Sequence, residues 1–344
     1  LEKADSLGKL TPKGKDVLAK LRIMRDAAMG RDGELTQRGA LQHKQIAERM
    51  LKNFPQIFAG KTNVDAKSTV VIRCILSMEN ALQEMTKMNP QLNITHDASY
   101  HDMYYMNYDD TLLFKKRMPT SAMVPYTEFC KNHEHPERVM RLLFNDDDYW
   151  KNHLNANKLY EVLFKQASNV QSTELRNSMS LYDLFTDDEI YDLWLINNAW
   201  WYINYGACPL NGGNQPYSQR NLLRKIISDA DSCIALPHPG VTLRYDHDTM
   251  VMPLTCLMDL DEMGMQVSDL EQLAYKGWNN YRIFPMACNI QFVFYHKKGS
   301  KDILVKVLRN ENEATLPIKT DIAPYYHWKD VRQFYLDKIN KFTE

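Results

Sequence analysis

The sequence predicts an α/β protein, with a mixed, mostly parallel sheet flanked by helices and a large, mostly helical insertion. Strand-like runs followed by helical patterns occur in residues 1–92 and 238–344 of the 344-residue chain, whereas residues 93–237 show few strand-like alternations. We therefore expect one α/β domain split between the two ends of the chain, with residues 93–237 as an insertion or cap. The chain length suits such a core domain with a large insertion.

The composition excludes several classes of protein. With 42 basic and 43 acidic side chains the net charge is −1, so a general nucleic-acid-binding surface is excluded and any phosphate recognition must be local. No run of 18 apolar residues is present, so we expect no membrane span. Six scattered cysteines without a C-x-x-C pair fit neither a zinc site nor a small disulfide scaffold. Two alternatives remain: six free thiols, or one or two disulfides.

A short repeat opens the chain. The pattern G-x-L-T-x-x-G occurs at residues 8–14 and again at 33–39, and each copy precedes an amphipathic pattern. Thr11 and Thr36 are good N-caps, because a hydroxyl can accept from free N–H groups of the first helical turn. The second helix should run from Gln37 to about Leu51. Its inward face is expected to comprise Leu41, Ile46, Met50 and Leu51.

The next unit resembles a strand followed by a helix. The β-branched run from Ser68 to Cys74 predicts a buried strand, and residues Ser77 to Lys87 predict a helix. Met78, Leu82 and Met85 should share the buried face of that helix. Arg73 would then lie at the carboxyl end of the strand, where open α/β sheets bind ligands.

Residues 93–237 are crowded with aromatic and acidic side chains. The clearest helix is expected from Asp187 to Tyr205, with a capping box formed by Thr186 and Glu189 and a stop at Gly206. A further helix is expected from Gln219 to Ala230. The inward face of the first helix is expected to comprise Ile190, Leu193, Trp194 and Trp201.

The α/β pattern returns near the end of the chain. Residues Val241–Tyr245 predict a strand, followed directly by His247-Asp248 and by a helix from Met250 to Leu260. Residues 290–295 and 303–308 alternate like an antiparallel hairpin pair. A helix over residues 325–342 should close the chain.

The sequence contains few candidate catalytic or metal-binding residues. Zinc-protease, hydrolase-elbow and dinucleotide motifs are absent, and His133 and His135 fit a solvated loop better than a metal site. Arg73 and the His247-Asp248 pair remain, each after a predicted strand. An arginine fork matches phosphate oxygens, a histidine adds a hydrogen-bond donor, and an aspartic acid can protonate a leaving oxygen. Together they predict phosphoryl transfer.

Three segments together resemble the histidine acid phosphatases, the family that includes phytases and multiple inositol polyphosphate phosphatases. Residues 67–77 are similar to its R-S-T-x-x-x-R-x-x-x-S element, and residues 243–249 to its strand ending in H-D-T. Residues 33–43 are similar to its G-x-L-T-x-x-G-x-x-Q-H element. The R-C-x-x-S-M form and the tail Val307–Glu311 resemble the inositol polyphosphate phosphatase branch.

The resemblance implies a phosphoglycerate-mutase-like fold and a phosphomonoesterase that works through a phosphohistidine, without metal or cofactor. Arg73 and His247 would bind the phosphoryl group, and Asp248 would donate a proton to the leaving alcohol. The substrate would be a small phosphorylated molecule, with inositol polyphosphates such as phytate preferred. The protein would be periplasmic or secreted, without membrane or nucleic-acid partners, and a monomer or homodimer.

The sequence departs from the family pattern at three points. It contains no Arg-His-Gly, the element that carries the family's nucleophile, and we expect that strand upstream of Leu1 and central in the sheet. Lys67 replaces the first arginine of R-S-T, which keeps the charge but not the bidentate fork. Asp248 places the chain with the H-D members, whereas many inositol polyphosphate phosphatases have H-A-E.

Further cations would be needed around a highly anionic substrate. Lys67, Arg220, Arg224 and Lys225 are the candidates, although the last three also fit the solvated face of a helix. A rival interpretation is a noncatalytic module that binds phosphate or inositol phosphates, which the missing nucleophile element favours. A carbohydrate-binding α/β protein, suggested by the aromatic insertion alone, is the third.

Overall fold

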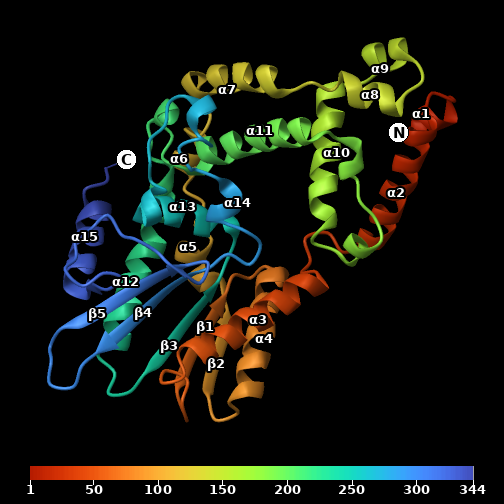
Figure 1. Ribbon diagram of the computed structural model, residues 1–344. Helices are drawn as coiled ribbons and strands as arrows, with labels where there is room; N and C mark the ends of the chain where they lie inside the picture. The colour runs from red at the N-terminus through yellow and green to blue at the C-terminus, as the bar shows by residue number, and fades with distance from the viewer. Residues whose placement is uncertain (344) are drawn as a thin grey trace. The chain divides into compact units, whose positions relative to one another are not determined.

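The computed structural model describes residues 1–343, and the chain divides into two compact units (Figure 1). The first unit comprises Leu1–Arg38 and Tyr126–Asn197 and is built of helices. The second comprises Gly39–Pro125 and Asn198–Glu344 and contains the strands. The helices of the first unit, with two that continue into the second, are α1 (Glu2–Ser6), α2 (Pro12–Ala28), α7 (Thr120–His133), α8 (Glu137–Leu143), α9 (Asp147–His153), α10 (Ala156–Val170) and α11 (Asp187–Tyr205).

The second unit is organised around a parallel sheet with the strand order β2-β1-β3. Its strands are β1 (Asn63–Ser68), β2 (Asn93–Ala98) and β3 (Gly240–Tyr245), and Asn63 of β1 pairs with both Asn93 and Gly240. A second sheet contains the antiparallel pair β4 (Ile290–His296) and β5 (Ile303–Arg309), with short partners β6 (Asn312–Glu313) and β7 (Tyr326–His327). The main helices are α3 (Gln37–Asn53), α4 (Ile72–Met88), α5 (Met103–Met106), α12 (Arg220–Ile234), α13 (Asp248–Met258) and α15 (Trp328–Asn340).

The mixed α/β fold with a mostly helical remainder confirms the predicted fold class, and several elements match closely. Helix α11 begins and ends at the predicted residues, and its capping box forms: the Thr186 N–H donates to Glu189, and the Glu189 N–H donates to Thr186 Oγ1. Thr11 caps α2 by accepting from the Gly14 N–H. The predicted hairpin is the β4–β5 pair.

The predicted strand over residues 68–74 is wrong in position. The strand β1 ends at Ser68, and the β-branched run after it forms a turn and the first turn of α4, where Ile72 is 65% exposed. In β1 alternate residues are buried, beginning with Val64 and Ala66, because one face packs against α3 and α4. Pairing with strands on both edges therefore selects the less apolar segment Asn63–Ser68.

The expectation of few strands after residue 93 is wrong for β2. This strand is an edge of the parallel sheet, and its residues are exposed or half-buried. An edge strand with little buried surface lacks the apolar alternation that sequence patterns detect. The proposed split at residues 92/93 and 237/238 stays a prediction.

Two predicted apolar faces are also only partly right. In α3 the inward face includes Leu51, but Leu41 is 53% exposed. In α11 only Leu193 of the four expected residues is fully buried, because this helix buries side chains around much of its circumference. The predicted face of α4, with Met78, Leu82 and Met85, is buried as expected.

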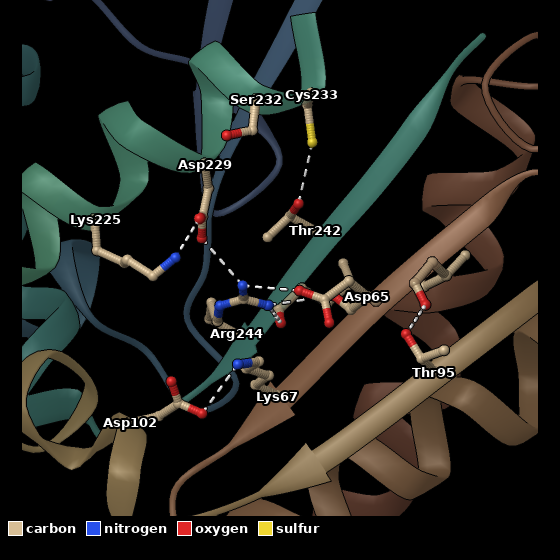
Figure 2. Close-up of polar contacts among 12 residues, drawn as sticks. Asp65, Lys67, Thr95, Asp102, Lys225, Asp229, Ser232, Cys233, Thr242 and Arg244 are labelled. Atoms are coloured by element: carbon tan, nitrogen blue, oxygen red, sulfur yellow. Dashed lines mark hydrogen bonds and ion pairs between the residues drawn. The ribbon is translucent and has the colours of Figure 1, made fainter. Parts of the chain in front are cut away.

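The two faces of the parallel sheet differ in chemistry. One face packs on α3 and α4 in an apolar core that contains Val64, Ala66 and Met78 (Figure 1). The opposite face carries charges. Figure 2 shows the Arg244 guanidinium of β3 between Asp65 of β1 and Asp229 of α12, at 2.9 and 3.0 Å.

Arg244 is the centre of this charged network. Its side chain is only 14% exposed, and it also donates to the Asp65 and Leu243 carbonyl oxygens. Beside it, Lys67 pairs at 3.0 Å with the buried carboxylate of Asp102. These contacts tie β3 to β1 and α12 just before the chain reaches His247.

Replacing Arg244 with Met should lower the free energy of unfolding by about 3 kcal/mol. This is the low end of the range for removing one partner of a buried ion pair, because Asp65 is partly exposed. Chemical denaturation measures it. The matched control is Lys52→Met in an exposed helical pair with Glu48, which should change stability by less than about 1 kcal/mol. Equal effects of the two variants would contradict the structural role of Arg244.

Candidate active site

Two distant segments of the chain meet at the carboxyl end of the parallel sheet. The last residues of β1 and β3, Ser68 and Tyr245, are paired in register. The Thr69 N–H then donates to the Tyr245 carbonyl oxygen at 3.1 Å, which continues the pairing one step past β1. Residues 69–74 and 246–249 are therefore neighbours, although about 175 residues separate them along the chain.

Arg73 lies in the first turn of α4, not at the end of a strand. Its backbone is held in the helix, where its carbonyl oxygen accepts from the Ser77 hydroxyl at 2.8 Å. Its Nη2 atom lies 3.4 Å from Nδ1 of His247. The prediction that Arg73 and His247 come together is thus confirmed, whereas their roles stay a prediction.

The His247 imidazole is enclosed on several sides. Its Nε2 atom lies 3.4 Å from the Thr69 hydroxyl, and its Nδ1 atom lies 3.6 Å from the Cys74 sulfur. Burial lowers the pKa of His247, and the positive charge of Arg73 lowers it further, against the opposing effect of Asp248. The imidazole is therefore neutral near pH 7 in this structure.

Two carboxyl groups flank His247. Asp248 is exposed in the first turn of α13, where its Oδ1 accepts from the Thr249 N–H at 2.9 Å. Asp246 accepts from the His247 N–H at 2.7 Å through Oδ1. Its buried Oδ2 has no hydrogen-bond partner within residues 1–343, and burial raises the pKa of Asp246 well above its ordinary value.

The local structure favours an anion. Helices α4 and α13 both begin here, with Val71 and His247 as N-caps and no side-chain hydrogen bond at either cap. The helix dipole places partial positive charge at such N-termini, although part of each first turn is already paired: the Thr249 N–H donates to Asp248 Oδ1, and the Cys74 and Met250 N–H groups donate to the cap carbonyl oxygens. Two helix N-termini, Arg73 and His247 thus lie together at this edge of the sheet.

Sequence reasoning missed three residues of this site: Thr69, Cys74 and Asp246. Thr69 is fully buried, and its position beside His247 depends on strand pairing that the sequence does not show. Cys74 donates to the Asp246 carbonyl oxygen at 3.5 Å, and burial raises the pKa of its thiol. Asp246 carried one signal, which is its position directly before His247.

The four other cations proposed for substrate binding have acidic or amide partners. Lys67 pairs with Asp102, Arg220 pairs with the buried Asp110, and Lys225 pairs with Asp229. Arg224 is exposed and donates to Asn340 at 2.8 Å. The geometry brings none of them into hydrogen-bonding contact with His247.

The cysteines and the possible metal-ligating side chains lie throughout residues 1–343. All six cysteines are free thiols. No group of three or more His, Cys, Asp or Glu side chains within residues 1–343 is arranged to hold a metal ion. No described helix is long and apolar enough to cross a membrane.

The chain belongs to the histidine phosphatase superfamily (branch 2), because the profile of that family matches residues 26–310. Together with the fold described above, this membership identifies the protein as a phosphatase. It also confirms the family that the sequence motifs at residues 67–77 and 243–249 indicated.

Several proteins similar to this chain are named multiple inositol polyphosphate phosphatases. The chain is 22% identical to multiple inositol polyphosphate phosphatase 1 of Gallus gallus over 87% of this chain and 69% of the relative. It is also 22% identical to the Homo sapiens protein of the same name, over 88% and 67%. In fold it is similar to the Bifidobacterium longum multiple inositol polyphosphate phosphatase in complex with inositol hexasulfate, with a TM-score of 0.81, 15% identity and coverage of 97% and 86%.

Removal of the positive charge and removal of the negative charge beside His247 should shift the pKa of its imidazole in opposite directions. Arg73→Met removes a neighbouring positive charge and should raise the pKa of His247, whereas Asp248→Asn removes a negative one and should lower it further. Titration of the imidazole followed by NMR measures both shifts. His327, whose pKa is raised by Asp321 and Asp302, serves as the internal control and should not move. Shifts of the same sign in both variants would contradict this electrostatic account.

Proposed function

We propose that this protein hydrolyses phosphate monoesters through a phosphohistidine intermediate. Arg73 and His247 bind the transferred phosphoryl group, and Asp248 is the proton donor. The observation that carries the proposal is the 3.4 Å contact between Arg73 and His247 at the start of two helices. Membership of the histidine phosphatase superfamily supports it.

The site supplies positive potential where charge develops on the phosphoryl oxygens. Arg73 donates from a planar fork, His247 donates from a ring nitrogen, and the helix N-termini add backbone N–H groups. A nucleophilic nitrogen attacks phosphorus while the bond from phosphorus to the leaving oxygen breaks. Asp248, in its carboxylic acid form, gives its proton to that oxygen. Its carboxylate then accepts a proton from the water that attacks the phosphohistidine.

The nucleophile in this proposal is a histidine on an Arg-His-Gly strand that the 344 residues do not contain. We propose that the strand precedes Leu1 and pairs with the outer edge of β3; a position between β1 and β3 is excluded, because these two strands pair directly. In support, the outer edge of β3 has no strand partner within residues 1–343, and all six residues of β3 are half-exposed. An uncovered edge of this kind is a liability that proteins normally cover.

Inositol polyphosphates are the substrate class we propose. The named relatives support this choice, including a structure in complex with inositol hexasulfate. Of the four further cations, Arg224 has the charge most available to an additional phosphate, because its guanidinium is exposed and has no acidic partner in the hydrogen bond it makes. We also propose an exported protein.

A protein with the complete nucleophile strand should release phosphate from inositol hexakisphosphate and form an acid-labile phosphoenzyme. The 344-residue chain alone should do neither, because it lacks the attacking nitrogen. Phosphate release and rapid-quench labelling with radioactive phosphoester measure the two properties. If the natural full-length protein binds phosphate without turnover, it is the noncatalytic binding module, the rival interpretation that the missing element favours.

Asp248→Asn should reduce hydrolysis of inositol hexakisphosphate by about 10²–10⁴-fold, the usual range for general acid catalysis. The rate of hydrolysis of an aryl phosphate should fall by a smaller factor, because an aryl oxide can leave without full protonation. Steady-state kcat with both substrates measures the difference. The matched control is Asp337→Asn on the exposed face of α15, which should leave both rates unchanged. Equal losses on both substrates would assign Asp248 a structural role.

A further inference from the structure

The Thr69 hydroxyl has no assigned part in the chemistry, yet it faces the imidazole that binds phosphate in the proposed reaction. Thr69 is fully buried, and its Oγ1 lies 3.4 Å from Nε2 of His247. Its backbone N–H is fixed by the bond to the Tyr245 carbonyl oxygen, so the side chain has a defined position. The two ring nitrogens of His247 thus have different partners: Thr69 at Nε2 and Arg73 at Nδ1.

The chemistry of these partners decides which nitrogen carries the proton. A guanidinium has only donors, so Nδ1 of His247 must accept from Arg73 and must be unprotonated. The neutral ring then carries its proton on Nε2, where the Thr69 oxygen is the acceptor. The Cys74 sulfur lies 3.9 Å from Nε2 and is a weaker acceptor than the Thr69 oxygen at 3.4 Å, and its thiol proton is donated to the Asp246 carbonyl oxygen.

A phosphate dianion reverses the requirement at Nδ1. Its oxygens accept hydrogen bonds, so an imidazole can bind it only through a nitrogen that carries a proton. With Nε2–H held by Thr69, the nitrogen on the Arg73 side can donate only if the ring gains a second proton. Without Thr69, and with Arg73 donating to the bound anion in place of Nδ1, a neutral ring could carry its single proton on Nδ1 and bind the anion without proton uptake.

We propose that Thr69 is a positioning residue that holds His247 as the Nε2–H tautomer, so that binding a tetrahedral dianion takes up one proton on Nδ1. The proton comes from solvent and no covalent bond changes. This inference rests on the proposed function only for the identity of the ligand. The tautomer itself is a property of the ligand-free protein.

Several charged and titratable groups face His247 and contribute to the same equilibrium. Arg73 and Cys74 belong to α4, Asp246 lies between β3 and α13, and Asp248 begins α13. Arg73 favours the neutral ring, whereas Asp248 favours the protonated one. A Thr69 variant leaves Arg73, Asp246 and Asp248 in place, but it also removes a hydrogen bond from Thr69 that lowers the pKa of Cys74, so the Thr69→Ser variant is needed to isolate the hydroxyl.

The first test is the ¹⁵N chemical shifts of the His247 ring in the ligand-free protein of natural length. We expect a protonated Nε2 and an unprotonated Nδ1 near neutral pH. A proton on Nδ1 would overturn the inference. This measurement needs no substitution and no turnover, so it remains decisive if a Thr69 variant does not fold.

The second test compares the pH dependence of sulfate affinity in four proteins. Sulfate is used because it stays a dianion across the titration range of histidine. The wild type should bind about tenfold more tightly for each pH unit of acidification above the pKa of free His247, as one-proton linkage requires. Thr69→Val should flatten this dependence, and Thr69→Ser should restore it.

The matched control is Thr242→Val. Thr242 is a second threonine of the same sheet. Its hydroxyl lies 3.3 Å from the Cys233 sulfur, and it does not contact His247 (Figure 2). It should keep the wild-type pH dependence. An unchanged slope in a folded Thr69→Val protein overturns the inference, whatever the protein hydrolyses. Conversely, an Nε2–H tautomer with a flattened slope in Thr69→Val supports it even if the protein lacks phosphatase activity.

Discussion

The parallel pairing of β1 with β3 is the constraint on which the site depends. The register places Ser68 beside Tyr245, and the bond from the Thr69 N–H to the Tyr245 carbonyl oxygen continues it by one residue. Both chains then leave the sheet at the same edge and turn into helices. Because parallel strands end at a common edge, the first turns of α4 and α13 meet there, and Arg73 reaches His247.

The same sheet separates two kinds of stabilising contact. Its apolar face rests on α3 and α4, whereas its charged face holds Arg244 between two carboxylates (Figure 2). The charged face fixes β3 against β1 and α12 immediately before His247. Such rigid support helps to keep Arg73 and His247 in contact, because small displacements weaken a hydrogen bond.

The electrostatics of the site follow from burial and from neighbouring charge. A guanidinium lies beside a neutral imidazole at the start of two helices, and within residues 1–343 no carboxylate is hydrogen-bonded to either ring nitrogen. Burial raises the pKa of the neighbouring Asp246 well above its ordinary value, because the charged carboxylate is poorly solvated there. An anion is the ligand that completes these contacts.

The sequence by itself determined the α/β class, the bounds of α11, the β4–β5 hairpin, and the nearness of Arg73 and His247-Asp248, because periodicity, capping residues and family motifs are local signals. Only the tertiary structure decided that β1 is Asn63–Ser68 and that β2 belongs to the sheet, because pairing on both edges outweighs β-branched content and an edge strand needs no apolar alternation. Likewise, Thr69 and Cys74 came to face His247 through a contact between segments far apart in the chain, which no local pattern encodes.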